Sequence, residues 1–274
     1  MQPILLFENT VQPNFTHAIE MAAVSDPGRL RPNNEDAVFA DARLGLAVLA
    51  DGMGGHNAGE VASQMAITAI GSELAHAFDT IPPHRPTPQG VPFAREVLLD
   101  VIQRTNAAIR LAAQQNPRYA GMGATLVVVQ FFDDRLVVAH VGDSRLYRLR
   151  AGELGCLTRD HSLLQEQLDK GMISPEQARR APNRNLVTRA LGVEADVVVD
   201  IAEHAVLPGD IYLLCSDGLN DMVDDREIAA ILSEFSANMQ LCATQLVQIA
   251  NQHGGRDNVS VILAKIKRAF PALA

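Results

Sequence analysis

Six acidic residues stand beside apolar, strand-like segments of this sequence, in positions that favour a shared site. Asp51 follows the apolar run 44–50 and Asp217 follows the run 211–216, and a glycine comes directly after each of them. The other acids precede such a run or occupy a turn between two runs; they are Glu35, Asp36, Asp257 and Asp143. In an antiparallel sheet, the end of one strand lies beside the start of its neighbour. The carboxylates are therefore predicted to gather at one edge.

Gathered carboxylates favour a site for hard divalent cations. Asp-Gly and Gly-Asp pairs are ordinary turn formers, so a turn explains any one of these acids taken alone. Together, however, they repel one another, and burying them without partners is costly or forces them to take up protons. A set of oxygen ligands points to Mg²⁺ or Mn²⁺ rather than zinc. Two such ions, about 3.5 to 4 Å apart, form the usual arrangement for displacement at a phosphoester.

The loop after Asp51 is rich in glycine, which fits the approach of a metal ion or a phosphate. Gly52, Gly54 and Gly55 would let a backbone carbonyl reach an ion and let a phosphate approach the helix expected next. Arg31 is a candidate holder of that phosphate, although a surface arginine explains its position equally well.

Two nucleotide-binding motifs are not matched by this loop. A phosphate-binding loop requires Lys and then Ser or Thr where the sequence has Glu60 and Val61. A dinucleotide fingerprint fails because its third glycine would fall at Asn57.

Short apolar runs between turn residues predict strands, and longer amphipathic runs predict helices. The expected strands are 18–25, 36–40, 44–50, 124–132, 135–141, 144–150, 196–201, 211–216 and 259–266. The expected helices are 58–77, 93–115, 225–235 and 238–252, and the Pro-rich segment 79–92 is expected to be a surface loop. Helices in adjacent pairs and strands joined by tight turns favour an α+β fold with antiparallel sheets covered by helices.

Composition limits the partners and the location. With 23 Lys and Arg against 32 Asp and Glu, the net charge of −9 repels nucleic acid and anionic membranes, so neither is expected as a partner. No apolar run approaches the roughly 20 residues that span a bilayer. Residues 1–15 lack the features of a signal peptide, so a cytoplasmic location is expected. The cysteines, at 156, 215 and 242, form no close pair, which argues against a disulfide framework and a structural zinc site.

The chain of 274 residues is long enough for a sizeable core, and no change of composition marks a linker. We expect one domain over residues 18–268, preceded by an N-terminal extension over residues 1–17.

Eight short motifs occur in one order along the chain. They are 31-RPNNED-36, 51-DGMGGH-56, 123-GATL-126, 142-GDSRLYRLR-150, 158-TRDHSL-163, 188-TRALG-192, 216-SDGL-219 and 256-RDNVSV-261. From about residue 19 to 267, this set resembles the bacterial branch of the protein phosphatase 2C family, the metal-dependent protein phosphatases. The resemblance implies a four-layer αββα sandwich, with two antiparallel sheets flanked by helix pairs. It also implies hydrolysis of phosphoserine and phosphothreonine in proteins.

The resemblance assigns the ligands of two Mn²⁺ or Mg²⁺ ions. Asp51 would bridge both ions. The Gly52 carbonyl and Glu35, directly or through water, would serve the second ion, while Asp217 and Asp257 would serve the first.

Three further residues receive roles from the same resemblance. Asp36 would support a metal-bound water, Arg31 would bind the substrate phosphate, and Asp143 together with Asp217 matches the position of a third ion in bacterial members. The implied mechanism is direct attack by a metal-bridging hydroxide, in line with the leaving oxygen and without a phospho-enzyme.

The general acid is the unassigned part of this mechanism. An acid that protonates the leaving oxygen should help the reaction. Many eukaryotic members of the family have His directly after the Asp-Gly pair, where this chain has Met53. His56 and His161 are the candidates, although each also fits a hydrogen-bonded structural histidine, and metal-bound water is a further alternative.

Residues from about 160 to 190 resemble the family's flap, a mobile element beside the active site. The stretch 174-SPEQ-177 predicts the start of a helix within it. A local positive charge that could steer a phosphorylated protein towards the site comes from Arg179, Arg180, Arg184 and Arg189. A solvated charged face explains these arginines equally well.

Three classes of function are open, and an active protein phosphatase is favoured because every expected acid is present. A non-catalytic, phosphoprotein-binding regulatory module on the same fold would have lost metal-binding acids. Another two-metal phosphoesterase, such as a small-molecule phosphatase or a nuclease, is distinguished only by its substrate. By resemblance, the partners are phosphorylated proteins and the Ser/Thr kinase that modifies them, and a monomer is expected.

Overall fold

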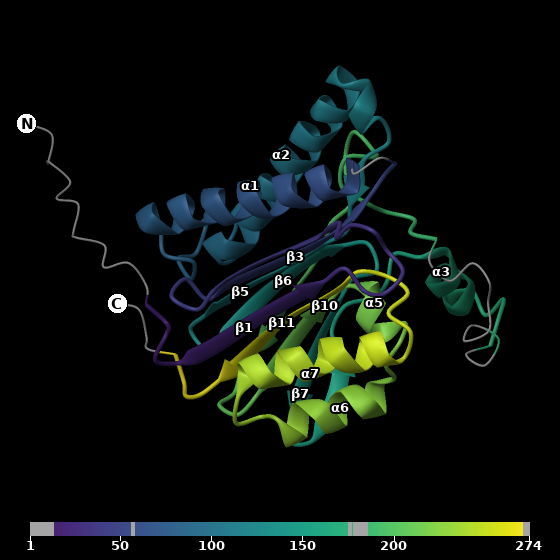
Figure 1. Ribbon diagram of the computed structural model, residues 1–274. Coiled ribbons are helices and arrows are strands. Elements are labelled where there is room, and N and C mark those ends of the chain that lie inside the picture. The colour runs from purple at the N-terminus through teal and green to yellow at the C-terminus, as the bar shows by residue number, and fades with distance from the viewer. Residues whose placement is uncertain (1–13, 56–57, 175–176, 178–185, 271–274) are drawn as a thin grey trace, which may run out of the picture.

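Two antiparallel β-sheets stack face to face in the computed structural model, which describes residues 14–55, 58–174, 177 and 186–270 (Figure 1). The first sheet has the order β1 (Ile19–Asp26), β11 (Val259–Ile266), β10 (Ile211–Cys215), β7 (Arg145–Arg150) and β8 (Glu153–Cys156). The second has the order β2 (Asp36–Asp41), β3 (Leu46–Met53), β5 (Leu126–Phe132), β6 (Arg135–Val141) and β9 (Asp200–Ala205). The short β4 (Gly123–Ala124) pairs with the end of β3.

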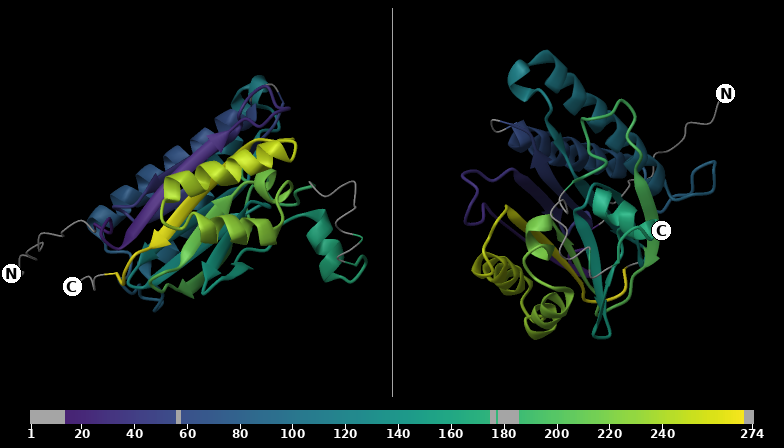
Figure 2. Two further views of the ribbon diagram at one scale, coloured as in Figure 1. Left: turned by 60° about the horizontal axis from the view of Figure 1, so that its bottom comes forward. Right: turned by 90° about the vertical axis from the view of Figure 1, so that its right-hand side faces the viewer.

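A pair of helices covers the outer face of each sheet. Helices α1 (Ala58–Thr80) and α2 (Phe93–Gln115) lie on the second sheet, and α6 (Asp225–Glu234) and α7 (Met239–Gln252) lie on the first (Figures 1 and 2). Shorter helices are η1 (Pro117–Tyr119), α3 (Leu163–Asp169) and α5 (Asp217–Asn220). The predicted four-layer αββα sandwich is therefore confirmed, as are the four long helices to within a few residues of their ends.

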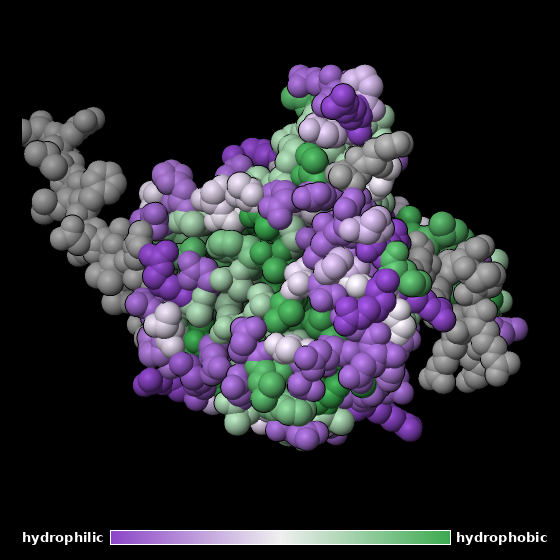
Figure 3. Space-filling model, in the orientation of Figure 1, coloured by the Kyte–Doolittle hydropathy of each residue, from purple (hydrophilic) through white to green (hydrophobic). Residues whose placement is uncertain are grey.

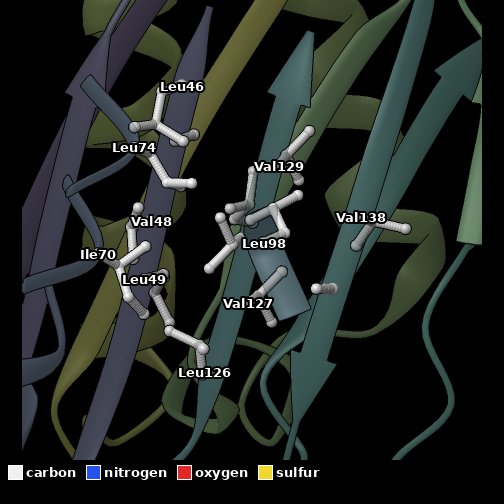
Figure 4. Packing of buried hydrophobic residues seen from close by; sticks show 14 of the residues in the cluster. Leu46, Val48, Leu49, Ile70, Leu74, Leu98, Leu126, Val127, Val129 and Val138 are labelled. Carbon is white, nitrogen blue, oxygen red and sulfur yellow. The ribbon is translucent and has the colours of Figure 1, made fainter. Parts of the chain in front are cut away.

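Burial on both faces explains why the central strands are continuous apolar runs. Every residue of β5 is buried, because α1 and α2 cover one face of its sheet and the other sheet covers the opposite face. Figure 4 shows Ile70 and Leu74 of α1 beside β3, and Leu98 of α2 beside β5. A second cluster of buried side chains joins the outer face of the first sheet to α6 and α7.

The last strand of the second sheet begins four residues later than predicted. The sequence predicts a strand over 196–201, whereas β9 covers Asp200–Ala205 and pairs with β6. The backbone before it is held by α2 instead, since Gln103 Nε2 donates to the Val197 carbonyl at 2.7 Å. The short strand β8 and the short helix α5 were not predicted, because four residues are too few to show a period.

Packing extends beyond the predicted limits of the domain at both ends. The Phe15 side chain is fully buried, and its backbone N–H donates to the Arg43 carbonyl at 3.0 Å. Its ring meets the edge of Phe270, with the centroids 5.1 Å apart. Residues 14–17 and 269–270 thus belong to the packed structure, while residues 1–13 lie outside the described part. The assignment of 18–268 to one domain stays a prediction.

The surface between the helix layers shows the edge of the sandwich. Hydrophobic residues are visible between the layers, where β1 lies, and hydrophilic and hydrophobic residues are mixed over α6 and α7 (Figure 3). Among the described residues, no helix is both long and apolar enough to cross a membrane. The loop between α1 and α2 covers residues 81–92, two residues fewer than the predicted 79–92, because α1 continues through Thr80.

Candidate metal centre

The ends of β2 and β3 bring two predicted carboxylates opposite each other. Asp36 and Asp51 are partners in the antiparallel register of these strands. The Asp51 backbone is fixed by Thr125, whose Oγ1 accepts from the Asp51 N–H at 3.2 Å and whose N–H donates to the Asp51 carbonyl at 2.8 Å. Asp36 Oδ2 accepts a hydrogen bond of 2.8 Å from Ser216 Oγ, which lies at the end of β10 in the other sheet. The pair therefore joins both sheets at one edge.

Close packing of backbone explains the glycines that follow Asp51. A Cβ atom on Gly52 would lie 2.1 Å from the Gly59 carbonyl oxygen, so no side chain fits there. The Gly52 N–H donates to the Glu35 carbonyl at 3.1 Å. A Cβ atom on Gly59, in the first turn of α1, would lie 2.8 Å from Glu35 Oε2. These two glycines let the helix start and the Glu35 carboxylate approach the end of β3.

The turn between β6 and β7 places Asp143 beside this strand end. Ser144 Oγ and Thr125 Oγ1 share a hydrogen bond of 2.7 Å, which ties the turn to the strand next to Asp51. Gly142 has a φ of +105°, and a Cβ atom there would lie 2.6 Å from Thr125 Cβ. Only glycine allows this turn to pack so closely against Thr125.

The ends of β10 and β11 supply the remaining acids. Asp217 begins α5 directly after β10, and Asp257 stands two residues before β11. The side chain of Asn258 organises the loop opposite. Its Oδ1 accepts from the Glu35 N–H at 2.8 Å, and its Nδ2 donates to the carbonyls of Pro27 and Asn33 at 3.0 and 2.8 Å.

A cleft of about 410 Å³ opens over these groups. Its polar lining includes Glu35, Asp51, Asp143, Asp217, Asp257 and Arg31, and its apolar lining includes Met53, Leu186 and Val187. Arg31 Nη2 lies 2.7 Å from Asp257 Oδ2, while just over half of the arginine side chain, 53%, remains exposed. The predicted gathering of the acids at one sheet edge is thus present in the structure, although their chemical roles stay proposals.

Burial and mutual repulsion make the carboxylates reluctant to ionise. Burial raises the pKa of Asp36 to about 6, against hydrogen bonds from Ser260 and Ser216 that lower it. Burial also raises the pKa of Asp143 to about 6, and the charge of Asp160 adds to this. The pKa values of Asp51 and Asp217 lie well above their usual range, first because of burial and then because of neighbouring carboxylates.

Divalent cations fit this set of donors. The groups are carboxylate oxygens, which Mg²⁺ and Mn²⁺ prefer. Burial first, and neighbouring carboxylates second, raise the pKa of Asp51, and a bound cation would offset both effects. Asp36 Oδ1 is buried and has no hydrogen-bond partner among the described residues, so its lone pairs are available to a further ligand. These residues therefore fit the Mn²⁺ or Mg²⁺ ions that the sequence predicts.

Only one of the two histidines predicted as general acid, His161, lies within the described residues. His56 lies outside the described residues. His161 is buried and is not among the residues that line the cleft. Its Nδ1 accepts from the Gly142 N–H at 3.1 Å, and its Nε2 lies 3.3 Å from Asp200 Oδ2. The geometry favours the structural interpretation of His161 over a role as general acid.

Part of the flap can be compared with its prediction. Ser174 and Gln177 form the reciprocal pair expected at a helix start, since each backbone N–H donates to the other side chain, at 2.8 and 3.3 Å. Arg189 Nη1 is paired with Asp200 Oδ1 at 2.9 Å, which offsets its charge. The other three arginines, at 179, 180 and 184, lie outside the described residues.

Several residues that build the site were missed by the sequence analysis. Four of them have uncharged side chains, and the fifth is an acid one helical turn after Asp217. They are Thr125, Ser144, Ser216, Asn258 and Asp221. The first four fall inside the motifs 123–126, 142–150, 216–219 and 256–261, so the motifs marked them without showing what they do. Asp221 adds negative charge beside Asp143 and Asp217, and only the fold reveals this because α5 brings it there.

An αββα sandwich with carboxylate oxygens gathered at one sheet edge defines this chain as an α+β protein with a candidate metal centre. The chain belongs to the protein phosphatase 2C family, because the model of that family matches residues 31–252.

Individual relatives agree with this assignment. The serine/threonine protein phosphatase PstP of Mycobacterium tuberculosis (strain ATCC 25618 / H37Rv) is 43% identical over 253 residues, which make up 92% of this chain and 46% of PstP. The chain thus spans about half the length of that relative. Protein phosphatase PhpP of Streptococcus pneumoniae is 35% identical over 252 residues, covering 90% of this chain and 98% of PhpP.

Solved structures show the same fold. The crystal structure of the M. tuberculosis phosphatase PstP/Ppp superposes with a TM-score of 0.82 at 41% identity, covering 92% of this chain and 100% of that one. A structure of the PstP catalytic domain in complex with two manganese ions has a TM-score of 0.76 at 41% identity, covering 91% and 99%.

Proposed function

We propose that this chain is a metal-dependent protein serine/threonine phosphatase that hydrolyses phosphoserine and phosphothreonine. The observation that carries the proposal is the cleft in which five acids and Arg31 converge, in a member of the protein phosphatase 2C family. Relatives that match most of this chain bear the name of serine/threonine phosphatases, which supports the same activity.

Mn²⁺ or Mg²⁺ would be held by the carboxylates of the cleft. Asp51 would contact two ions, Asp217 and Asp257 would hold the first, and Glu35 and the Gly52 carbonyl would hold the second. Asp143 and Asp217 would hold a third. When bound, such ions lower the pKa of water and neutralise charge on phosphoryl oxygens.

The chain's own groups would bind and orient the substrate. The Arg31 guanidinium is half-exposed at the cleft, and its planar fork suits two phosphate oxygens. Its partner Asp257 fixes the fork in place at 2.7 Å. Asp36 Oδ1, buried and without a hydrogen-bond partner in the described part of the chain, would accept a hydrogen bond from a water molecule and orient it, while Ser216 holds the other oxygen. The apolar wall at Met53, Leu186 and Val187 would limit the access of bulk water.

The partners follow from this activity and are part of the proposal. They are phosphorylated proteins and, indirectly, the Ser/Thr kinase that modifies them. We also propose that the protein acts as a monomer in the cytoplasm.

Hydrolysis of a phosphothreonine peptide by the purified protein tests the proposal. We expect turnover with Mn²⁺ and its loss with EDTA. The Asp217→Asn variant should lose activity by about 100-fold or more, because an ion without its charged ligand binds more weakly and neutralises less charge. The exposed Asp79→Asn serves as a matched control with unchanged activity.

Other outcomes point to the alternative functions. A folded protein that turns over no phosphopeptide with any divalent ion would contradict the phosphatase proposal and favour the phosphoprotein-binding module. Faster hydrolysis of a sugar phosphate or of DNA than of every phosphopeptide would instead favour another two-metal phosphoesterase.

A further inference from the structure

The beginning of the flap is joined to the turn that carries Asp143. The His161 N–H donates to the Gly142 carbonyl at 2.9 Å, and the Gly142 N–H donates back to His161 Nδ1 at 3.1 Å. The same residue anchors the end of the flap, since the Thr188 N–H donates to the His161 carbonyl at 2.8 Å. One buried histidine therefore contacts both ends of the flap and the residue directly before Asp143.

The hydrogen bond from Gly142 defines the role of Nδ1 in this histidine. The amide of Gly142 offers only a proton, so Nδ1 must present a lone pair, and a neutral ring then carries its proton on Nε2. Asp200 Oδ2 lies 3.3 Å from Nε2, and Arg189 Nη1 lies 3.2 Å from the same nitrogen. Asp200 is itself held by Arg189 Nη1 at 2.9 Å, and the His140 ring stacks on His161 with the centroids 4.7 Å apart. Every polar group of the His161 ring thus has a partner.

The same arrangement argues against a metal ion between these rings. His140, His161 and Asp200 lie close enough for their ligand atoms to share one ion. However, a metal at His161 Nε2 would require the proton to move to Nδ1, which would break the bond from Gly142. Arg189 already supplies positive charge there, with Nη1 3.2 Å from His161 Nε2.

Asp143 is consequently held from two directions. On one side, Ser144 bonds to Thr125, next to Asp51. On the other side, the Gly142 N–H bonds to His161, and Gly142 packs so closely on Thr125 that a Cβ atom there would lie 2.6 Å from Thr125 Cβ. We propose that His161 is a positioning residue that holds the Asp143 turn in place for cation binding through its Nδ1 atom. This inference rests on the proposed function, in which Asp143 helps to bind a third ion.

Two substitutions separate a positioning role from a catalytic one. In His161→Asn, the side-chain Oδ1 stands as many bonds from Cα as Nδ1 does, so it can accept from Gly142, but nothing replaces Nε2. In His161→Leu, both nitrogens are lost. A general acid acting through Nε2 would fail in both variants, whereas a residue acting through Nδ1 would fail only in the second.

The measurement is Mn²⁺ binding by calorimetry without substrate, followed by peptide hydrolysis. The binding component that disappears in Asp143→Asn defines the Asp143-dependent site. We expect its Kd to rise about 10- to 100-fold in His161→Leu, the usual effect of losing a partner behind a ligand, and to stay within about threefold of the original in His161→Asn. The kcat of His161→Asn at saturating Mn²⁺ should match that of the unaltered protein.

Three results would overturn the inference. They are an unchanged Asp143-dependent site in His161→Leu, a loss of that site in His161→Asn, or the absence of any Mn²⁺ component that depends on Asp143. If His161→Leu does not fold, His161→Ala, which also lacks both ring nitrogens, takes its place. If the unaltered protein binds Mn²⁺ but hydrolyses no phosphopeptide, the proposed function fails while the binding data still test His161.

Discussion

At the scale of single residues, the candidate site depends on uncharged groups as much as on its acids. Thr125 and Asn258 hold the backbone beside Asp51 and Glu35, and Ser216 holds one oxygen of Asp36. The carboxylates would otherwise move apart, because they repel one another; the pKa values of Asp51 and Asp217 are raised first by burial and then by this repulsion. Glycines occupy the positions where backbone segments meet so closely that no side chain would fit.

Replacement of Gly52 tests how tightly this backbone is packed. In Gly52→Ala, the new methyl group would lie 2.1 Å from the Gly59 carbonyl oxygen, so α1 or β3 must shift. We expect a loss of about 3 kcal/mol in the free energy of unfolding, at the upper end for overpacking, and a Tm lower by several degrees. Gly55→Ala is the matched control, because no atom of the other described residues lies within 4 Å of a Cβ atom there, and its Tm should not change. Equal Tm values for the two variants would contradict the close approach.

At the scale of elements, α2 holds the segment that returns from the flap. Asn106 is fully buried, its Oδ1 accepts from the Gly192 N–H at 2.7 Å, and its Nδ2 donates to the Glu194 and Ala195 carbonyls at 3.0 and 3.2 Å. Leu191, next to Gly192, pairs with Ala124 of β4, opposite Gly52. The end of the flap is therefore connected through β4 to the strand end that carries the metal centre.

Asn106→Leu should loosen this connection. The change leaves one N–H and two carbonyls without their partner, so we expect a loss of about 3 kcal/mol in the free energy of unfolding. Hydrogen exchange at the Gly192 amide should become faster than in the unaltered protein. Gln114→Leu, the same kind of change at an exposed position of α2, should alter neither quantity. Unchanged exchange at Gly192 in Asn106→Leu would show that α2 does not hold this segment.

At the scale of the whole molecule, the cleft concentrates negative charge in a chain that already carries a net charge of −9. Both sheets contribute acids to the cleft, so ionised carboxylates repel one another across the contact between the two sheets. Cations that bind only the folded protein would reduce this repulsion and would stabilise the folded protein by mass action.

This arrangement predicts how stability without metal depends on pH. Burial raises the pKa values of Asp36 and Asp143 to about 6, so the folded protein holds these protons more tightly than the unfolded chain, in which Asp titrates near about 4. Between about pH 4 and 6, these groups therefore make the free energy of unfolding fall as pH rises. In EDTA, Tm should decline from pH 5 to pH 7, and added Mn²⁺ at pH 7 should restore it.

Asp36→Asn isolates this contribution from that of other groups. Burial lowers the pKa values of His161 and His204, so these two groups make the free energy of unfolding increase as pH rises. Their contributions cancel when Asp36→Asn is compared with the unaltered protein. The decline in EDTA should be shallower in Asp36→Asn by about 1 kcal/mol or more, the equivalent of about one pKa unit. Parallel curves for the two proteins would contradict the raised pKa of Asp36.

The sequence alone determined the long elements and the residue types of the site. Continuous apolar runs such as β5 and amphipathic runs such as α2 carry strong local signals, because burial dictates their periodicity. Acids followed by glycine at strand ends predicted the gathered carboxylates, and the ordered motifs predicted the family. The predicted start of the strand at residue 196 is wrong, because a side chain of α2 bonds to the backbone just before β9.

Only the tertiary structure decided which groups support the acids and how. Ser216 reaches Asp36 across 180 positions of sequence, and Asn106 reaches Gly192 across 86, so no local pattern records either bond. His161 shows the difference most clearly. Its type and motif fit both a general acid and a structural histidine, and the choice depends on which atoms face each ring nitrogen. Those atoms belong to Gly142, Asp200 and Arg189, which the fold, and not the sequence around His161, brings together.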